Sequence, residues 1–206
     1  TFALAKVYPF GNNTAVVGDM KNQYAAILTY GKENFFNIHK LLYSNSLALG
    51  GNFYPVLTYY LFSPIILIAL FFSNKYIPLF YFINICLNAG FISLTTYIFL
   101  LKSKFVNSYV DKTVNVEISN VLRLIFGIIF TLSTFYVQYS HTIMWFDAII
   151  FFPLVLLGYE QLINSNKVIL YCISLILLIL SNYYIGVMVL RSEEHTSELQ
   201  SLLMIS

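Results

Sequence analysis

Charge is the scarcest property of this 206-residue sequence: Asp, Glu, Lys and Arg together make up only 10% of it. Soluble proteins carry roughly 25% charged residues, so the chain lacks the surface of a water-soluble domain. The low charge also excludes an intrinsically disordered chain and a nucleic-acid-binding protein, which needs a basic surface. Hydrophobic side chains, in contrast, make up 59% of the sequence. The sequence therefore predicts an integral membrane protein.

Chemical motifs are equally scarce. The two cysteines, Cys86 and Cys172, both lie inside apolar runs, so neither a disulfide framework nor a cysteine metal site is expected. Glycine-rich nucleotide-binding patterns, the paired histidines of zinc proteases and the nucleophile elbow of hydrolases do not occur in the sequence. We therefore expect no identifiable cofactor, and in particular no soluble nucleotide.

Residues 191–206 differ in composition from the rest of the chain. The string RSEEHTSELQS at residues 191–201 matches, codon for codon, the translation of a sequencing-library adapter. We therefore treat residues 191–206 as an artefact tail, the alternative being a genuine polar loop. Without this tail the chain has ten Lys and Arg against six Asp and Glu, a net charge of +4. Because the sequence begins at Thr1 and not at a methionine, we also expect a fragment of a longer protein.

The apolar runs predict the membrane topology. A helix that crosses a membrane needs about 20 apolar residues, and residues 1–5 fit the end of a truncated first span. The sequence thus predicts an all-α, polytopic transmembrane protein. Its expected transmembrane helices are residues 77–101, 121–139, 145–163 and 168–190.

The basic residues predict which side each loop faces. Lysines gather around the 102–120 loop, and short Lys-rich loops lie in the cytoplasm. Residues 6–76 then form an extracellular loop, and a long polar loop between spans is typical of a functional segment. The run 53–72 is long enough to cross the membrane, but Pro55 and Pro64 interrupt a helix there. We predict surface-lying helices over 53–72, with a membrane crossing as the alternative.

Few acids lie where chemistry is expected. Asp19 follows Gly18 in the outer loop and could act as general base for an acceptor hydroxyl, although a turn or helix cap explains the same residue. Asp147 begins the predicted span 145–163, where an ionisable residue indicates function but is also favoured by the helix dipole. His141 could bind a phosphate or pair with Asp147, or lie at the interface without a partner.

Four stretches, in order, resemble the bacterial YfhO family of membrane proteins. They are YPFGNNTAVVGDMKNQY (8–24), SLALGGNFYPVLTYYLFSP (46–64), YSHTIMWFDAIIFFPLVLLGYEQLI (139–163) and SNYYIGVM (181–188). With the intervening spans, the resemblance covers residues 6–190. It implies the N-terminal part of a larger protein similar to type-C (GT-C) glycosyltransferases, in which the first outer loop carries an essential acid.

The resemblance also implies an activity. A member of this family is expected to move a sugar from a polyprenyl-phosphate-linked donor to a cell-wall polymer such as lipoteichoic acid, on the outer face of the cell membrane. Implied partners are the lipid bilayer, a donor-synthesising glycosyltransferase and a flippase, with no nucleic acid. The excess of Lys over Arg fits a Gram-positive bacterium. A transporter or flippase of lipid-linked saccharides is the alternative, and a scaffold without chemistry is a third interpretation.

The resemblance also implies roles for individual residues. Asp19 falls where the essential acid is expected, which implies a catalytic role and, if a divalent cation takes part, a metal-ligating one. The fragment alone is expected to be inactive. The implied substrate-binding residues are Asn12, Asn13, Gln23, Tyr24, Asn52, His141, Trp145, Asp147, Asn182 and Tyr183.

Overall fold

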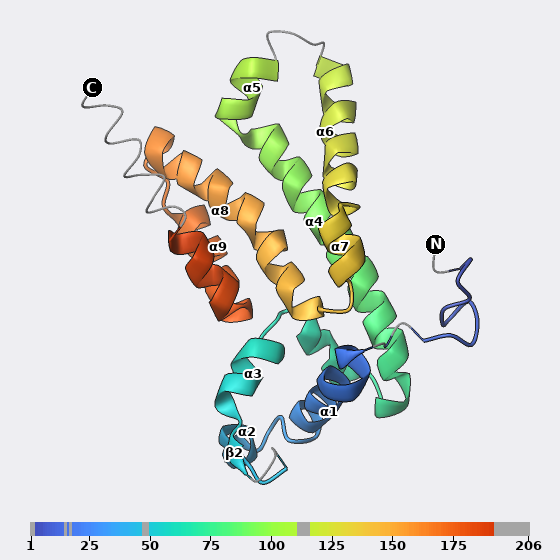
Figure 1. Cartoon of the computed structure of the whole chain (residues 1–206). Helices are drawn as coiled ribbons and strands as arrows, with labels where there is room; N and C mark the ends of the chain where they lie inside the picture. Colours follow the sequence, from blue (N-terminus) through green and yellow to red (C-terminus); the bar gives the residue numbers. More distant parts are fainter. Residues whose placement is uncertain (1–2, 15, 17, 47–49, 111–115, 192–206) are drawn as a thin grey trace.

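Two long helices organise the structure, a computed structural model that describes residues 3–14, 16, 18–46, 50–110 and 116–191 (Figure 1). They are α4 (Ile77–Lys102) and α8 (Phe146–Ser165). The short turns η3 (Asn74–Tyr76) and η4 (Ile143–Trp145) lead into them. With these turns, both helices are long and apolar enough to cross a membrane, at the positions where the sequence predicts the spans 77–101 and 145–163. Residues 192–206, most of the predicted tail, lie outside the described residues.

The other two predicted spans are not continuous helices. The segment 121–139 divides into α6 (Val116–Thr131) and α7 (Thr134–Tyr139). The segment 168–190 begins as α9 (Ile169–Ser181), breaks at Asn182 and continues as helix over 183–191. The described residues therefore contain two helices of spanning length and two shorter apolar ones, so four full spans are not confirmed.

Polar side chains explain both breaks. Near the first, the Thr131 hydroxyl donates a hydrogen bond to the Gly127 carbonyl at 2.9 Å, and such side-chain bonds compete with the helical ladder. At the second, Asn182 has extended backbone angles (φ −152°, ψ 90°). Its side-chain oxygen accepts a hydrogen bond from the Ile185 backbone N–H at 3.0 Å. Asn182 therefore ends one helix and caps the next.

Helices α8 and α9 form a tightly packed antiparallel hairpin. Asn166, with φ 51°, ends α8 in the left-handed conformation and lets the chain reverse. The two backbones meet at Gly158, where an added Cβ would lie 2.6 Å from both Cα and N of Tyr171. A residue without a side chain is therefore required at this crossing.

Helix α6 presents an apolar face that no described residue covers. Large hydrophobic side chains between Ile118 and Phe130 are about half exposed. A water-soluble protein rarely leaves so large a continuous apolar surface in solvent, whereas a bilayer accepts it without cost. The exposed side chains include Val121, Leu122, Leu124, Ile125, Phe126, Ile128, Ile129 and Phe130.

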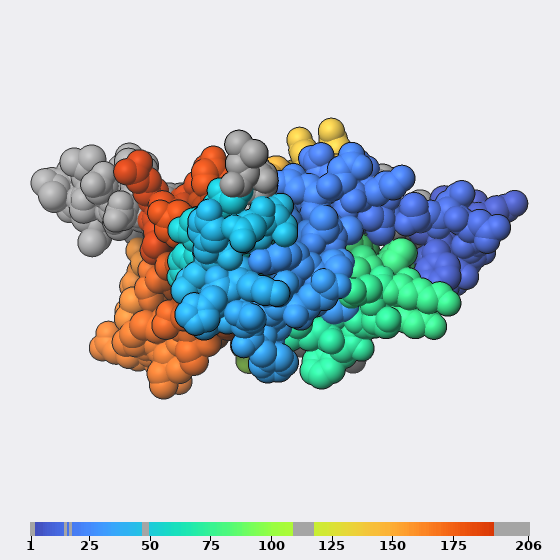
Figure 2. All heavy atoms as spheres, turned by 90° about the horizontal axis from the view of Figure 1, so that it is seen from below, coloured from blue at the N-terminus to red at the C-terminus, as the bar shows by residue number. Residues whose placement is uncertain are grey.

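Short elements from residues 18–76 cover one end of the long helices, here named the loop face (Figures 1 and 2). Residues 53–72, predicted to lie on the membrane surface, form two short helices separated by a segment containing Pro64. Neither helix is long enough to span a bilayer, and their place on its surface stays a prediction. The elements are η1 (Met20–Tyr24), α1 (Ala25–Glu33), α2 (Ile38–Leu42), the paired strands β1 (Tyr43–Ser44) and β2 (Gly51–Asn52), α3 (Tyr54–Tyr60) and η2 (Ile66–Phe71). At the opposite end, α5 (Lys104–Val110) follows α4.

One hydrophobic cluster fastens the loop face to the long helices. Met20 and Leu28 from the loop pack in the same cluster as Phe80 and Tyr81 of α4 and Phe146 of α8, and all five are buried. Burying each such side chain contributes about 1.5–3 kcal/mol. The loop is therefore held in a defined position over the first turns of α4 and α8.

Candidate functional site

Asp19 lies at the start of η1 with its carboxylate exposed. The preceding Gly18 has φ +56°, a conformation that favours glycine because it has no Cβ. The Asp19 side chain makes no capping hydrogen bond to the helix that follows. The capping role that the sequence left open is therefore not seen, and the carboxylate is accessible from solvent.

Tyrosines from two segments meet beside this acid. The ring centroids of Tyr24 in η1 and Tyr60 in α3 lie 5.3 Å apart, and those of Tyr59 and Tyr60 lie 4.8 Å apart. Gln23 donates a side-chain hydrogen bond to the Tyr60 hydroxyl at 3.2 Å. Two predicted site residues, Gln23 and Tyr24, are thus brought together with two tyrosines of α3.

The same group of rings reaches the start of α8. Trp145 donates its Nε1–H to the Tyr59 hydroxyl at 3.0 Å. Its ring centroid lies 5.6 Å from that of Tyr139, which in turn lies 6.3 Å from the ring of His141. The fold therefore connects His141 and Trp145 to the first-loop residues. The rings of Tyr24, Tyr59, Tyr60, Tyr139 and Trp145 are referred to below as the aromatic cluster.

Burial and nearby groups raise the pKa of two tyrosines of the cluster, Tyr24 and Tyr60. Burial, the neighbouring Tyr60 phenol and the Asp19 carboxylate together raise the pKa of Tyr24 to about 12. Burial is also the largest cause of the raised pKa of Tyr60, followed by Tyr59 and Asp19, while the Gln23 hydrogen bond lowers it. The hydroxyls of Tyr24 and Tyr60 therefore remain hydrogen-bond donors at physiological pH, within electrostatic range of Asp19.

Two further predicted residues are buried near the cluster. The Asp147 side chain is 2% exposed and lies near Ser63, and its Oδ1 has no hydrogen-bond partner among the described residues. Asn182 is fully buried and donates its side-chain N–H to the Met144 carbonyl at 2.9 Å. Asn182 thus uses its amide within the chain, whereas Asp147 keeps an unused acceptor.

The remaining predicted residues do not join the cluster. Asn12 and Asn13 belong to the segment 3–14, which lies on the other side of α4 from α3 (Figure 1). The side chain of Asn13 donates to the Ala5 carbonyl at 2.8 Å within that segment. Asn52 accepts from the Tyr54 N–H at 3.0 Å, close to the start of α3, and Tyr183 is 65% exposed. Their substrate-binding roles stay predictions.

Sequence reasoning missed Tyr59, Tyr60 and Ser63. In the sequence, the paired tyrosines are typical of a membrane interface, and Ser63 is an ordinary turn residue before Pro64. Only the fold of α3 back toward η1 and α8 places them beside Tyr24, Trp145 and Asp147. No local sequence signal marks this meeting.

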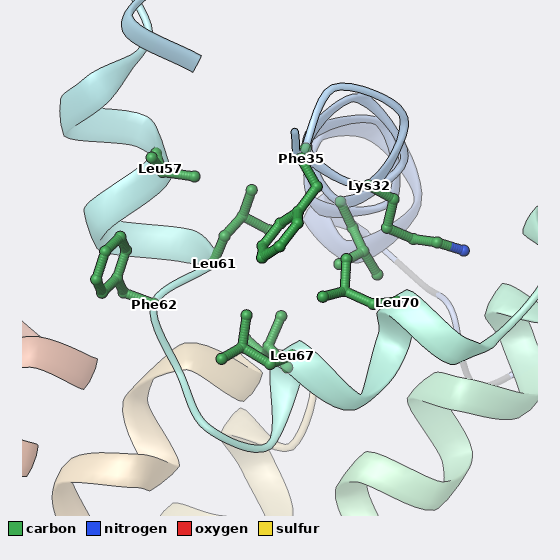
Figure 3. Close-up of a pocket in the computed structure, with 10 residues that line it drawn as sticks. Lys32, Phe35, Leu57, Leu61, Phe62, Leu67 and Leu70 are labelled. Carbon is green, nitrogen blue, oxygen red and sulfur yellow. The ribbon is translucent and has the colours of Figure 1, made fainter. Parts of the chain in front are cut away.

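An apolar pocket of about 200 Å³ adjoins the cluster (Figure 3). Leu61, at the end of α3, and Leu67, in η2, point into it, and Phe35 faces them. Lys32 contributes its aliphatic stem while its ammonium group points away, toward its hydrogen-bond partners Phe72 O and Asn74 Oδ1. The lining is therefore apolar. Three of its residues, Leu28, Leu61 and Ile66, also line a narrower space against Tyr24 and Tyr60.

The described residues contain no group of three or more His, Cys, Asp and Glu side chains that could hold a metal ion. Asp19 offers a single exposed carboxylate. Any cation bound there would need its other ligands from the substrate or from parts of the protein outside the described residues.

Comparison with known proteins identifies the family. The model of the family described as bacterial membrane protein YfhO matches residues 1–190. The chain belongs to the YfhO family. The match ends directly before the segment 191–206 that the sequence sets apart. No curated protein and no solved structure matches the chain. This YfhO chain is therefore a bacterial membrane protein, whose apolar α4, α6, α8 and α9 agree with that assignment.

Proposed function

We propose that the full-length protein is a membrane-embedded, inverting glycosyltransferase of GT-C-like fold. It moves a sugar from a polyprenyl-phosphate donor to a cell-wall polymer, such as lipoteichoic acid, on the outer face of a Gram-positive membrane. The observation that carries this proposal is the exposed carboxylate of Asp19 beside the aromatic cluster, with an apolar pocket adjoining it. The loop face is the outer face in this arrangement, as the positions of the lysines indicate.

Asp19 is the general base of the proposed reaction. Its carboxylate takes the proton from an acceptor hydroxyl as that oxygen forms a bond to the anomeric carbon of the sugar. The bond from the anomeric carbon to the phosphate oxygen breaks at the same time, and the polyprenyl phosphate leaves with the electron pair. Attack opposite the leaving group inverts the anomeric configuration. A positioned base of this kind typically contributes 10²–10⁴-fold to the rate.

The aromatic cluster and the apolar pocket supply binding. Aromatic faces suit the C–H faces of a sugar ring, and the neutral hydroxyls of Tyr24 and Tyr60 can donate hydrogen bonds to its oxygens. The pocket is apolar and shares lining residues with the narrower space against Tyr24 and Tyr60, and a chain of isoprene units is the apolar part of the proposed donor. Its burial there would place the attached phosphate near the cluster.

The buried groups support a positioning role at the start of α8. Asp147 keeps one carboxyl oxygen without a partner among the described residues, close in sequence to Trp145 and His141. Gln23, His141 and Trp145 then contact donor or acceptor groups, and Asn12, Asn13, Asn52, Asn182 and Tyr183 are proposed to complete the site with parts of the longer protein. A donor-synthesising glycosyltransferase and a flippase would provide the lipid-linked sugar.

Substitution of Asp19 tests the proposal. In a deletion strain complemented with the full-length gene, Asp19→Asn is expected to lower sugar decoration of the wall polymer at least 100-fold. Glu33→Gln is the matched control, because Glu33 is an acid of the same loop whose side-chain oxygen accepts from Asn74 at 2.9 Å, a bond that glutamine can keep. Normal decoration by Asp19→Asn at a normal protein level would refute the catalytic assignment.

A transporter or flippase of lipid-linked saccharides is the second candidate, and the break at Asn182 favours it. Transporters place discontinuous helices at their substrate sites, and the helix that follows α9 restarts beside Met144. Reconstituted protein distinguishes the two functions. A flippase moves a lipid-linked sugar across the vesicle membrane without consuming it, whereas the transferase releases polyprenyl phosphate.

A further inference from the structure

A second polar cavity lies at the opposite end of the long helices from the loop face. Its volume is about 210 Å³, and it is formed where α4 and α8 end and the chain turns into α5 and α9. Three of its lining residues are lysines, against a single acid. We refer to it as the basic pocket; it is lined by Lys102, Lys104, Leu157, Glu160, Gln161, Asn164, Ser165 and Lys167.

The three ammonium groups have no partner within the described part of the chain. No ion pair or hydrogen bond there involves the side-chain nitrogen of Lys102, Lys104 or Lys167, and all three residues are exposed. The side-chain nitrogens of all three lysines are therefore available to a ligand in the cavity. Three like charges around one small cavity repel one another, so an anion between them would be stabilised.

The single acid of the basic pocket is already used. Glu160 Oε1 accepts hydrogen bonds from the backbone N–H groups of Lys104 at 2.5 Å and Phe105 at 3.1 Å. A carboxylate in this place satisfies the unpaired N–H groups that begin α5. Glu160 thereby holds Lys104 at the cavity without pairing with its ammonium group. The net charge of the lining remains +2.

Apolar side chains next to the basic pocket distinguish a lipid from a free anion. Phe105, Ile163, Val168 and Ile169 are 68%, 60%, 47% and 75% exposed. The first three are next to a polar lining residue in the sequence, and Ile169 lies two positions after Lys167. Charged groups beside an exposed apolar rim match an amphiphile, whose phosphate enters the cavity while its acyl chains contact the rim. A soluble phosphate would leave this apolar surface in water.

The position along the helices also fits a lipid headgroup. Both candidate spans, Asn74–Lys102 and Ile143–Ser165, end at the basic pocket, so it lies at the level where the hydrocarbon of a bilayer gives way to headgroups. Basic pockets between helices on the cytoplasmic side are suited to anionic lipid headgroups. We propose that the basic pocket binds the phosphate of an anionic phospholipid, with phosphatidylglycerol as its simplest form, in the leaflet opposite the loop face.

Native mass spectrometry of the full-length protein in neutral detergent tests this proposal. Phosphatidylglycerol is titrated against phosphatidylcholine, and the occupancy of bound lipid is measured. Each basic residue near an anionic lipid surface is worth about fivefold in affinity. Single Lys→Gln variants at residues 102, 104 and 167 should therefore weaken phosphatidylglycerol binding about fivefold each, and the triple variant on the order of 100-fold. Phosphatidylcholine binding should not change.

Matched variants keep the test falsifiable. Replacing Lys21, Lys40 and Lys75 on the loop face by Gln removes the same charge from exposed sites and should leave the tight phosphatidylglycerol site intact. The triple Lys→Arg variant of the basic pocket should retain binding. Glu160→Gln can still accept both backbone hydrogen bonds but lacks the negative charge, so it should bind phosphatidylglycerol more tightly than the wild type.

Three results would overturn the proposal. Equal loss of binding in the loop-face and pocket triple variants would show that overall charge, and not this cavity, attracts the lipid. Displacement of the lipid by millimolar inorganic phosphate would identify a soluble anion as the ligand. An unchanged phosphatidylglycerol affinity in the pocket triple variant, with an unchanged melting temperature, would exclude the site itself.

Discussion

Trp145 donates a hydrogen bond to the hydroxyl of Tyr59 across 86 positions of sequence, at 3.0 Å. Trp145 ends η4, directly before α8, and Tyr59 lies in the last turn of α3. The bond therefore joins the start of α8 to the loop face. Both side chains are only partly buried, so each remains able to contact a ligand. The contact therefore links the positioning of the loop to the place where a substrate would bind.

A double-mutant cycle measures this link. Trp145→Phe and Tyr59→Phe each remove one partner and keep an aromatic ring. A hydrogen bond of this kind contributes about 0.5–1.5 kcal/mol, so each single variant should lose about that free energy of unfolding. The double variant should lose little more than either single variant. Unfolding in detergent, followed by loss of helical circular dichroism, supplies the values. Fully additive losses would show that the bond does not form.

Replacement of Gly18 tests how the turn presents Asp19. An added Cβ at Gly18 meets no described atom within 4 Å, so only the backbone conformation opposes a side chain there. Gly18→Val should cost about 1–2 kcal/mol or move Asp19, and sugar decoration should fall. Gly18→Asn should keep most activity, because asparagine tolerates this conformation. Equal activity of both variants would show that the turn does not position the acid.

A spectrophotometric titration tests the interaction of Tyr24 with Asp19. The pKa of Tyr24 is raised to about 12 by burial, the Tyr60 phenol and the Asp19 carboxylate, whereas a tyrosine in the unfolded chain ionises near pH 10. The 295 nm difference between wild type and Tyr24→Phe should thus have its midpoint near pH 12. Adding Asp19→Asn to both proteins should lower that midpoint. An unchanged midpoint would place the carboxylate too far away to act.

The raised pKa of Tyr24 also determines whether the free energy of unfolding rises or falls at alkaline pH. Between pH 10 and 12 the folded protein retains the Tyr24 proton that the unfolded chain releases. The free energy of unfolding must therefore fall as the pH rises through this window. Tyr24→Phe should reduce the slope of that fall. Melting temperatures of the two proteins between pH 9 and 12 provide the comparison.

Gly158 and Gly90 form a matched pair for testing the α8–α9 contact. A Cβ at Gly158 would lie 2.6 Å from backbone atoms of Tyr171, whereas a Cβ at Gly90 would meet no described atom within 4 Å. Gly158→Ala should therefore destabilise the protein by about 1–3 kcal/mol, and Gly90→Ala should be neutral or stabilising by up to about 1 kcal/mol. Thermal unfolding in detergent measures both. Similar melting temperatures would contradict the close contact.

The long helices could be predicted from the sequence, but the breaks in the shorter ones could not. Helices α4 and α8 follow uninterrupted apolar runs, which a hydropathy argument detects directly. Ser133 and Asn182 lie in runs of similar mean hydropathy, where one polar residue changes an average very little. Specific hydrogen bonds accompany both breaks, from Thr131 to Gly127 near the first and from Ile185 to Asn182 at the second, and composition carries no information about them.

Part of the candidate site could likewise be predicted from the sequence, and part could not. The family motifs contain both Asp19 and Trp145, and the place of Asp19 after Gly18 in the outer loop indicates it independently. Their neighbours Tyr59 and Tyr60 come from a segment whose path depends on how α3 folds back after the β1–β2 pair. Contacts of this kind arise from tertiary packing between distant segments, which a single sequence does not reveal.

The length of α9 has a consequence for how the protein enters the membrane during synthesis. Its 13 residues extend about 20 Å at 1.5 Å per residue, short of a hydrocarbon core of about 30 Å. If α9 entered the bilayer alone during synthesis, the side-chain amide of Asn182 would lie in lipid. Met144, which accepts from that amide, has already emerged with α8 by then. The α8–α9 hairpin should therefore insert as a pair, with the earlier helix sheltering the polar end of the later one.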